Sequence, residues 1–174
     1  MTNRAGVGST TSWRLVAALL GVVSAWPVTA SPADAPPPAA QALQVGEAVS
    51  AFDAEGIDGE VKHITFPKGS TTVLLFFLSG CPVCHRMIPE WNSAFERKPK
   101  GLQVVGVLMD KEPPGFFMAT PITFPVVRAP AGDFRNRFKI QRVPMTLRVA
   151  AGGRVEDVAL GQIDPIRLGE VFRP

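Results

Sequence analysis

The chain has 174 residues and a formal net charge of +3 at pH 7. Its two cysteines are too few for a disulfide scaffold, and a chain of this length does not need one to bury a core. No basic cluster with interleaved aromatic residues occurs in the sequence, so we expect no nucleic-acid partner.

Residues 1–30 have the pattern of a secretory signal peptide. Arg4 and Arg14 come first, then an apolar stretch of about twelve residues (15–26), then the small-residue cleavage pattern Val28-Thr29-Ala30. A spanning helix needs roughly twenty apolar residues, so the stretch is short for a membrane anchor, although an uncleaved leader that anchors the protein is the alternative. We expect a periplasmic or otherwise exported protein, cleaved after about Ala30.

The leader also carries part of the charge and indicates the redox compartment. Residues 1–30 hold two arginines and no acidic residue, so cleavage lowers the net charge from +3 to +1. An export destination is oxidising, so a cysteine pair can form a disulfide there. Residues 31–44 are rich in proline and alanine and poor in large apolar groups, which indicates a linker. Residues 45–174, about 130 in number, have the size of one domain.

The first part of this domain predicts a hairpin followed by a buried strand. Turn signals at Glu55-Gly56 and Asp58-Gly59 divide residues 45–66 into short segments, which indicates an N-terminal β-hairpin. Residues 72–78 form a continuous run of β-forming, mainly apolar residues. Such a run is typical of a strand that is buried on both faces.

Residues 82–98 predict a helix. Pro82 suits its first turn, where a missing backbone donor costs nothing, and Ile88, Trp91 and Phe95 recur at helical spacing. Pro89 inside the helix removes one backbone hydrogen bond and clashes with the preceding turn, so we expect a kink there.

The second part of the domain continues the alternation of strands and helices. We expect strands at 103–109 and 124–127, short helices at 112–119 and 132–138, a hairpin of 145–150 with 154–160, and a last helix at 165–172 that Asp164 caps. Strands that alternate with helices and end in a hairpin predict an α/β fold with a central mixed β-sheet flanked by helices.

Both cysteines lie in one pentapeptide, Cys81-Pro82-Val83-Cys84-His85, directly after the apolar strand. This pattern is compatible with three chemistries. Two thiols at this spacing form a reversible disulfide, bind a soft metal such as Cu(I), or bind haem through thioether bonds with the histidine as ligand. A purely structural disulfide is less plausible, because a four-residue loop removes little chain entropy.

Taken together, the strand, the C-x-x-C at the start of the next helix, and Val143-Pro144 before a hairpin resemble the thioredoxin fold. The added N-terminal hairpin and residues 106–128 resemble the TlpA/ResA group of exported thiol-disulfide oxidoreductases. The tract Phe138-Lys139-Ile140-Gln141-Arg142-Val143-Pro144-Met145-Thr146-Leu147 is similar to that group's stretch around its cis-proline, and Gly152-Gly153-Arg154-Val155 to the hairpin that follows. The resemblance extends from about residue 45 to the end of the chain.

The resemblance implies a protein disulfide oxidoreductase whose active site is Cys81 and Cys84, supported by Pro82, Val83 and His85. A helix N-terminus lowers the pKa of a thiol, so Cys81 is expected to be the nucleophile, and the more shielded Cys84 to resolve the mixed disulfide. On this interpretation His85 is a solvated helix residue that can tune the thiols electrostatically. No cofactor is expected beyond the disulfide itself.

Val143 and Pro144 are the expected substrate-binding element. Cis bonds are a minority even before proline, and only the resemblance favours the cis form here. In that form the backbone of Val143 would face the disulfide and pair with an extended substrate segment. The implied partners are exported proteins that bear cysteine pairs, with a membrane-embedded electron donor or acceptor. The expected roles are cell redox homeostasis and cytochrome c maturation, carried out by a monomer.

The rival interpretations use the same atoms. The motif matches c-type haem attachment, but small c-type cytochromes are mostly helical and this sequence is rich in strands. A Cu(I)-binding module is the third alternative, whereas a closed zinc site lacks further ligands. A peroxidase is disfavoured because the threonine-proline surroundings expected of a peroxiredoxin cysteine are missing.

Three positions depart from the resemblance. Members commonly have tryptophan before the first cysteine, where this chain has Gly80, and often a glutamate three residues after the second cysteine, where it has Met87. Thioredoxins proper bury an aspartate at the position of Leu75. A carboxylate at either of the last two positions would help to move protons during exchange. The Pro-Val dipeptide instead resembles the methylamine-utilisation relatives, and the direction of electron flow is left open.

Overall fold

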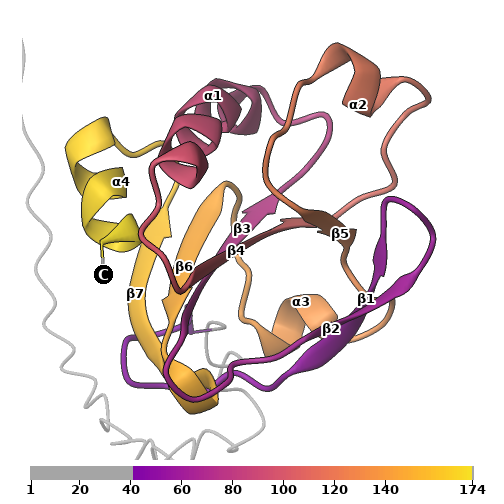
Figure 1. Cartoon of the computed structure of the whole chain (residues 1–174). Helices are drawn as coiled ribbons and strands as arrows, with labels where there is room; N and C mark the ends of the chain where they lie inside the picture. Colours follow the sequence, from indigo (N-terminus) through magenta and orange to yellow (C-terminus); the bar gives the residue numbers. More distant parts are fainter. Residues whose placement is uncertain (1–40, 174) are drawn as a thin grey trace, which may run out of the picture. The chain divides into compact units, whose positions relative to one another are not determined.

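The computed structural model describes residues 41–173 (Figure 1). The predicted leader and most of the predicted linker lie outside this range. Leu43, which the sequence pattern assigned to the linker, is 4% exposed and packs into the core. The packed core therefore includes a residue that lies before the predicted boundary at residue 45.

In the described part of the chain, seven strands form one mixed sheet in the order β2-β1-β5-β4-β3-β6-β7. The strands are β1 (Phe52–Gly56), β2 (Val61–Ile64), β3 (Thr71–Phe77), β4 (Leu102–Leu108), β5 (Val126–Arg128), β6 (Met145–Val149) and β7 (Val155–Leu160). Strand β3 is parallel to β4 and antiparallel to β6. The predicted N-terminal hairpin is β1–β2, and the predicted C-terminal hairpin is β6–β7.

The central strand β3 is buried on both faces, as its continuous apolar run predicted. Val73, Leu75 and Phe77 belong to one hydrophobic cluster, and Leu74 and Phe76 belong to the other. This alternation follows from the two-residue period of a strand. The strand thus joins both halves of the core and holds the segment that follows it in a fixed place.

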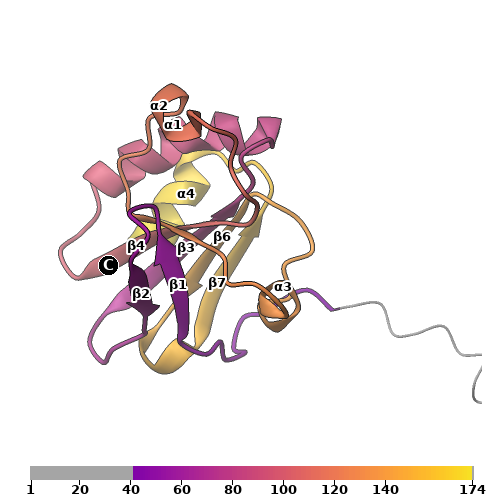
Figure 2. The same ribbon diagram turned by 90° about the vertical axis from the view of Figure 1, so that its right-hand side faces the viewer.

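Helices cover both faces of the sheet (Figures 1 and 2). They are α1 (Pro82–Glu96), α2 (Phe116–Ala119), α3 (Phe134–Arg137) and α4 (Pro165–Phe172). The cluster of Leu75 includes buried residues of α1 and α4, whereas the cluster of Leu74 includes Phe134 of α3. Asp164 caps α4 as predicted, because its carboxylate accepts from the backbone N–H groups of Ile166 and Arg167.

Helix α1 is continuous from Pro82 through Pro89 to Glu96. Its buried side includes Trp91, whose indole Nε1–H donates to the hydroxyl of Thr146 on β6 at 3.2 Å. This bond satisfies two polar groups inside an apolar core, where an unpaired group would be costly. The helix is therefore fixed to the sheet nearly three turns beyond Cys81, the start of the cysteine motif.

Several predicted boundaries were wrong by a few residues. Helix α2 begins at Phe116 rather than residue 112, because Gly115 just before it is in the left-handed conformation with φ 80°. Strand β5 covers 126–128 rather than 124–127, since Pro125 has no N–H to donate to a ladder. Helix α3 covers 134–137 rather than 132–138.

Among residues 41–173, none of the helices has both the length and the apolar character needed to cross a membrane.

Candidate active site

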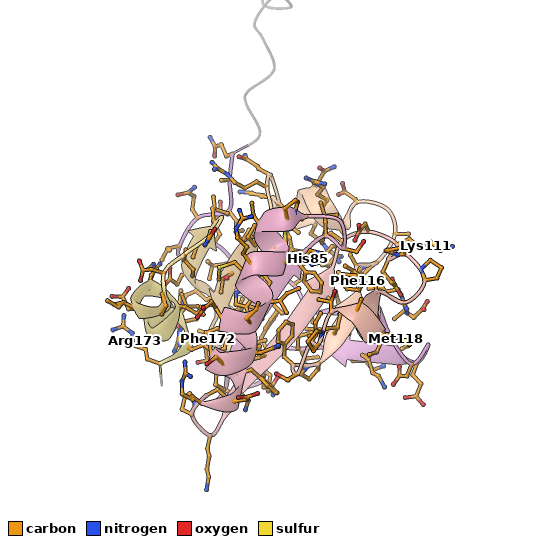
Figure 3. The ribbon with its side chains drawn as sticks, turned by 90° about the horizontal axis from the view of Figure 1, so that it is seen from above. His85, Lys111, Phe116, Met118, Phe172 and Arg173 are labelled. Atoms are coloured by element: carbon orange, nitrogen blue, oxygen red, sulfur yellow. A yellow bond between two sulfur atoms is a disulfide. The ribbon has the colours of Figure 1, made fainter. Side chains whose placement is uncertain are left out.

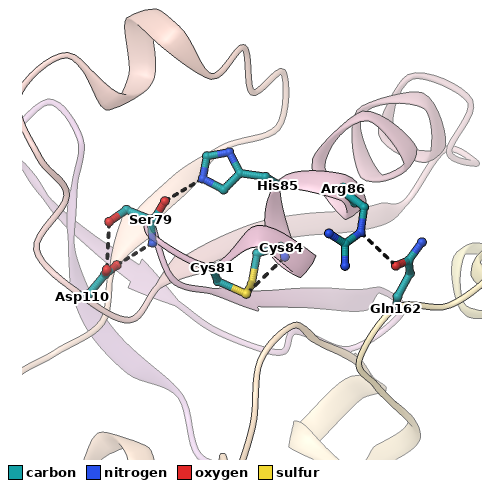
Figure 4. Close-up of a disulfide and its surroundings, with 7 residues drawn as sticks. All are labelled: Ser79, Cys81, Cys84, His85, Arg86, Asp110 and Gln162. Carbon is teal, nitrogen blue, oxygen red and sulfur yellow. Dashed lines mark hydrogen bonds between the residues drawn. A yellow bond between two sulfur atoms is a disulfide. The ribbon is translucent and has the colours of Figure 1, made fainter.

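The two cysteines form a disulfide at the N-terminus of α1 (Figure 4). Their Cα atoms are 5.2 Å apart, within the range that a disulfide spans. Cys81 is the N-cap residue, with extended backbone, and Pro82 occupies the first helical position without losing a hydrogen bond. The C-x-x-C spacing therefore places both sulfur atoms at the same end of the helix.

The two sulfur atoms differ in their surroundings. The Sγ of Cys81 accepts a hydrogen bond from the backbone N–H of Cys84 at 3.2 Å, and the residue is partly exposed. Cys84 is 0% exposed and belongs to the core cluster under α1. A sulfur that faces a free helix N–H is stabilised as a thiolate, whereas a buried one is not. Between them, Pro82 is exposed and Val83 half-exposed.

The structure brings Val143 and Pro144 to the same edge of the sheet as the disulfide. The peptide bond between them is cis, as the resemblance implied. They directly precede β6, which runs antiparallel to β3, so the start of β6 lies beside the end of β3. Val143 is half-exposed and packs against the same cluster as Cys81. The carbonyl of Pro144 accepts from the N–H of Gly161 at 2.8 Å.

His85 is exposed, as expected for a solvated helix residue, but its ring is held in place. The Nε2 atom lies 2.6 Å from the carbonyl oxygen of Ser79. Because a carbonyl oxygen only accepts, Nε2 carries the hydrogen of this bond. The ring also contacts Phe116 of α2 edge-on, with centroids 5.9 Å apart (Figure 3).

Sequence analysis missed one acidic residue of the site, Asp110. Its Oδ1 accepts from the backbone N–H of Ser79 and its Oδ2 from the Ser79 hydroxyl, both at 2.8 Å (Figure 4). Asp110 follows β4 and Ser79 follows β3, and these neighbouring strands are parallel, so their carboxyl ends share one edge. A prediction of Asp110 would have required knowing that β3 and β4 pair. Leu75 and Met87, the two positions where the resemblance implied an acidic residue, are both 0% exposed in the apolar core.

Two further contacts tie the site to the rest of the molecule. Arg86 Nε donates to the side-chain oxygen of Gln162 at 3.2 Å, which joins α1 to the loop before α4. On the other side, Glu112 pairs with Arg128, whose Nε lies 3.2 Å from both carboxylate oxygens. The hydrogen bond from Arg128 holds the pKa of the Glu112 carboxyl below its ordinary value.

The rival chemistries would use the same two sulfur atoms, which here are bonded to each other. Among residues 41–173, no three His, Cys, Asp or Glu side chains gather into a group of the kind that holds a metal ion. The two cysteines of the site differ in exposure, since Cys81 is partly exposed and Cys84 is buried.

Comparison with known proteins identifies the family. The model of the AhpC/TSA family matches residues 45–157. The chain belongs to this family. It is 31% identical over 143 residues to sporulation thiol-disulfide oxidoreductase A of Bacillus subtilis (strain 168), covering 77% of this chain and 86% of that protein. It is 27% identical over 133 residues to thiol-disulfide oxidoreductase ResA of Oceanobacillus iheyensis, covering 72% and 69% of the two chains.

The structural comparison agrees with the sequence comparison. The crystal structure of StoA from Bacillus subtilis matches with a TM-score of 0.62 at 26% identity, covering 72% of this chain and 98% of that one. This AhpC/TSA family member therefore has a thioredoxin-like fold and is a thiol-disulfide oxidoreductase of the TlpA/ResA type. Both were expected from the strand, the C-x-x-C motif and the X-Pro element.

Proposed function

We propose that the protein exchanges its Cys81–Cys84 pair with cysteine pairs of exported proteins, with Cys81 as the nucleophile. The observation that carries this assignment is the contrast between the two sulfur atoms. Cys81 is partly exposed and accepts the Cys84 N–H, whereas Cys84 is 0% exposed. Cys81 is therefore the cysteine that a partner disulfide contacts first. The redox group is the cysteine pair itself, and the proposal needs no further cofactor.

The proposed reaction moves two electrons in two steps. The thiolate of reduced Cys81 attacks one sulfur of the partner disulfide, which forms a mixed disulfide and releases the other partner sulfur as a thiolate. Cys84 then gives its proton to the partner thiolate released in the first step and attacks the Sγ of Cys81. This step forms the Cys81–Cys84 disulfide, breaks the mixed disulfide and releases the second partner sulfur as a thiolate. The same steps in reverse oxidise a partner dithiol.

Val143 and Pro144 are the proposed binding edge for the partner. Val143 is half-exposed and, with Pro144, directly precedes β6, so its backbone N–H and C=O would be placed to pair with an added segment. An extended partner segment would hydrogen-bond to both groups, as a strand added to a sheet does. Because this edge lies beside the end of β3, such a segment would place its cysteine near Cys81. Pro82 and Val83 would form the opposite wall.

We further propose that the protein works in an exported compartment as a monomer and exchanges electrons with a membrane-embedded partner, as in cytochrome c maturation. The signal-peptide pattern of residues 1–30 supports export. The mass of the protein purified from its own cells tests the export part of this proposal. A chain that begins near residue 31 is expected, and an intact leader on a protein retained in the cytoplasm would contradict it.

The roles of the two cysteines are tested by two variants that serve as controls for each other. We expect Cys81→Ala to abolish exchange with a model disulfide, because it removes the attacking sulfur. We expect Cys84→Ala to accumulate mixed disulfides with partners, because the resolving sulfur is missing. Non-reducing gels followed by mass spectrometry measure both. A Cys84→Ala protein that turns over like the wild type would refute the assignment.

The direction of electron flow is measured by the equilibrium of the pair with glutathione. In this fold, a potential of about −270 mV is typical of a reductant and one of about −120 mV is typical of an oxidant. The same titration tests the proposed function as a whole. A wild-type protein that does not equilibrate with glutathione at any ratio of its two forms would contradict it.

A further inference from the structure

Ser79 is the centre of a hydrogen-bonded cluster next to the reactive disulfide (Figure 4). It is 7% exposed and donates both its backbone N–H and its hydroxyl to Asp110. Its carbonyl accepts from the ring of His85. Every polar group of Ser79 is thus hydrogen-bonded, to Asp110 after β4 and to His85 in α1.

The residue after Ser79 explains why such a clamp matters. Gly80 is exposed, and a side chain at its position would meet nothing within 4 Å. A glycine that packs against nothing samples many backbone conformations. Cys81 comes next, and its backbone must keep Sγ within reach of the Cys84 N–H, 3.2 Å away. The bonds to Ser79 remove the freedom that Gly80 would otherwise give to this segment.

Asp110 also differs in charge from its neighbours around the site. Next to the motif and to the cis-proline element in the sequence are His85, Arg86 and Arg142, all of them basic or able to become cationic, and Glu112 beyond Lys111 is paired with Arg128. A negative charge near a thiol disfavours its thiolate, whereas positive charges favour it. Because Asp110 is hydrogen-bonded to Ser79, two residues before Cys81, its charge opposes the effect of these basic residues on the Cys81 thiolate.

We propose that Asp110 is a positioning residue that fixes the segment before Cys81 through Ser79, and that its charge makes the cysteine pair more reducing. This inference rests on the proposed exchange function and deepens it. A less stable Cys81 thiolate makes the reduced form of the pair less stable. The equilibrium between the reduced form and the disulfide form therefore shifts toward the disulfide. Asp110 thereby places a negative charge near the cysteine pair, although the two positions where the resemblance implied an acidic residue hold Leu75 and Met87.

The test compares Asp110→Asn with the wild type. Asparagine has nearly the same size, and its amide oxygen still accepts from the Ser79 N–H, but it carries no charge. We expect the equilibrium constant with glutathione to shift about tenfold toward the dithiol, which corresponds to a potential about 30 mV less negative. We also expect the Cys81 thiolate, followed by its ultraviolet absorbance, to form at lower pH than in the wild type.

Two variants separate charge from positioning. Ser79→Ala keeps the carboxylate and removes only the hydroxyl bond, so we expect an equilibrium constant within about twofold of the wild type and slower exchange. Asp133→Asn removes an aspartate charge at the start of α3, outside the site, and should change neither property. If Asp110→Asn does not fold, Asp110→Ser replaces it, because a serine hydroxyl still accepts one hydrogen bond without charge.

The outcomes distinguish this inference from the proposed function. A folded Asp110→Asn protein with wild-type equilibrium and wild-type thiolate titration would overturn the role of Asp110 and leave the exchange function intact. A shift toward the disulfide would overturn the assigned sign of the charge effect. Loss of glutathione equilibration already in the wild type would instead overturn the function itself.

Discussion

At the scale of single residues, the pair of Glu112 and Arg128 near the site makes stability depend on pH. Arg128 holds the folded-state pKa of Glu112 below its ordinary value, chiefly through the side-chain hydrogen bond. A lowered folded pKa means that the pair stabilises the fold fully above the unfolded glutamate pKa of about 4.3. The contribution is lost as the pH falls through the lower folded value.

We therefore predict that Glu112→Gln lowers the free energy of unfolding by about 1 kcal/mol at pH 7, since the Glu112 side chain is only 14% exposed. The difference from the wild type should shrink as the pH falls below the unfolded glutamate pKa of about 4.3 and through the lower folded-state value, because the wild-type carboxylate becomes protonated. Urea denaturation over a series of pH values from 7 downward measures this. Glu170→Gln is the matched control, because that exposed pair with Arg167 contributes little. Equal effects of both variants would contradict the assignment.

Residues close in sequence were predicted, and residues joined only by the fold were not. Cys81, Cys84 and His85 lie in one pentapeptide, so their spacing on a helix could be derived directly. Asp110 is 31 residues from Ser79, and no local pattern joins them. Their meeting depends on β3 and β4 being parallel neighbours, and the sequence predicted both strands but not which strands pair. The hydrogen bond of His85 was missed for a different reason, because Ser79 is only six residues away but lies before the helix, outside its periodic pattern.

At the scale of elements, strong periodicity located the strands and helices, and special backbone residues set their ends. The buried run of β3 and the pattern of α1 were found almost to the residue. The errors at α2 and β5 come from Gly115 and Pro125, whose conformational preferences override the apolar pattern. The order of the seven strands depends on contacts far apart in the chain, so the alternation predicted only a mixed sheet.

The turn of the β6–β7 hairpin offers a test of local geometry. Gly152 and Gly153 both have positive φ, 73° and 86°. A side chain at Gly152 would meet nothing within 4 Å, but one at Gly153 would collide with the backbone carbonyl of Val49. That carbonyl cannot move easily, since the N–H of the same Val49 donates to the Gly153 carbonyl at 2.8 Å.

We predict that Gly152→Ala destabilises the protein by about 1 kcal/mol, the cost of an unfavourable backbone conformation alone. Gly153→Ala should cost at least about 3 kcal/mol, because the collision adds to the same backbone cost. Urea denaturation followed by the fluorescence of Trp91, the only tryptophan in residues 41–173, measures both. Similar losses for the two variants would show that the Val49 contact does not constrain the turn.

At the scale of the whole molecule, the start of the folded domain is a consequence of core packing rather than of composition. The low content of large apolar groups in residues 31–44 predicts a linker up to residue 44, but Leu43 belongs to the cluster that includes Val49 and Phe138. One leucine in a proline- and alanine-rich segment does not change its average composition. It does add an apolar side chain that the core on the α3 face of the sheet encloses.

This difference gives a prediction about truncation. A chain of residues 38–174 should unfold at the same urea concentration as one of residues 31–174, whereas residues 45–174 should lose about 2 kcal/mol, the value of burying one leucine side chain. Leu43→Ala within residues 38–174 is the matched control and should reproduce most of that loss. Because Leu43 belongs to the core cluster on the α3 face and the cysteines pack with the other cluster, under α1, we expect exchange with glutathione to be unchanged in all three proteins. Equal stability of the 38–174 and 45–174 chains would show that the domain begins at residue 45 after all.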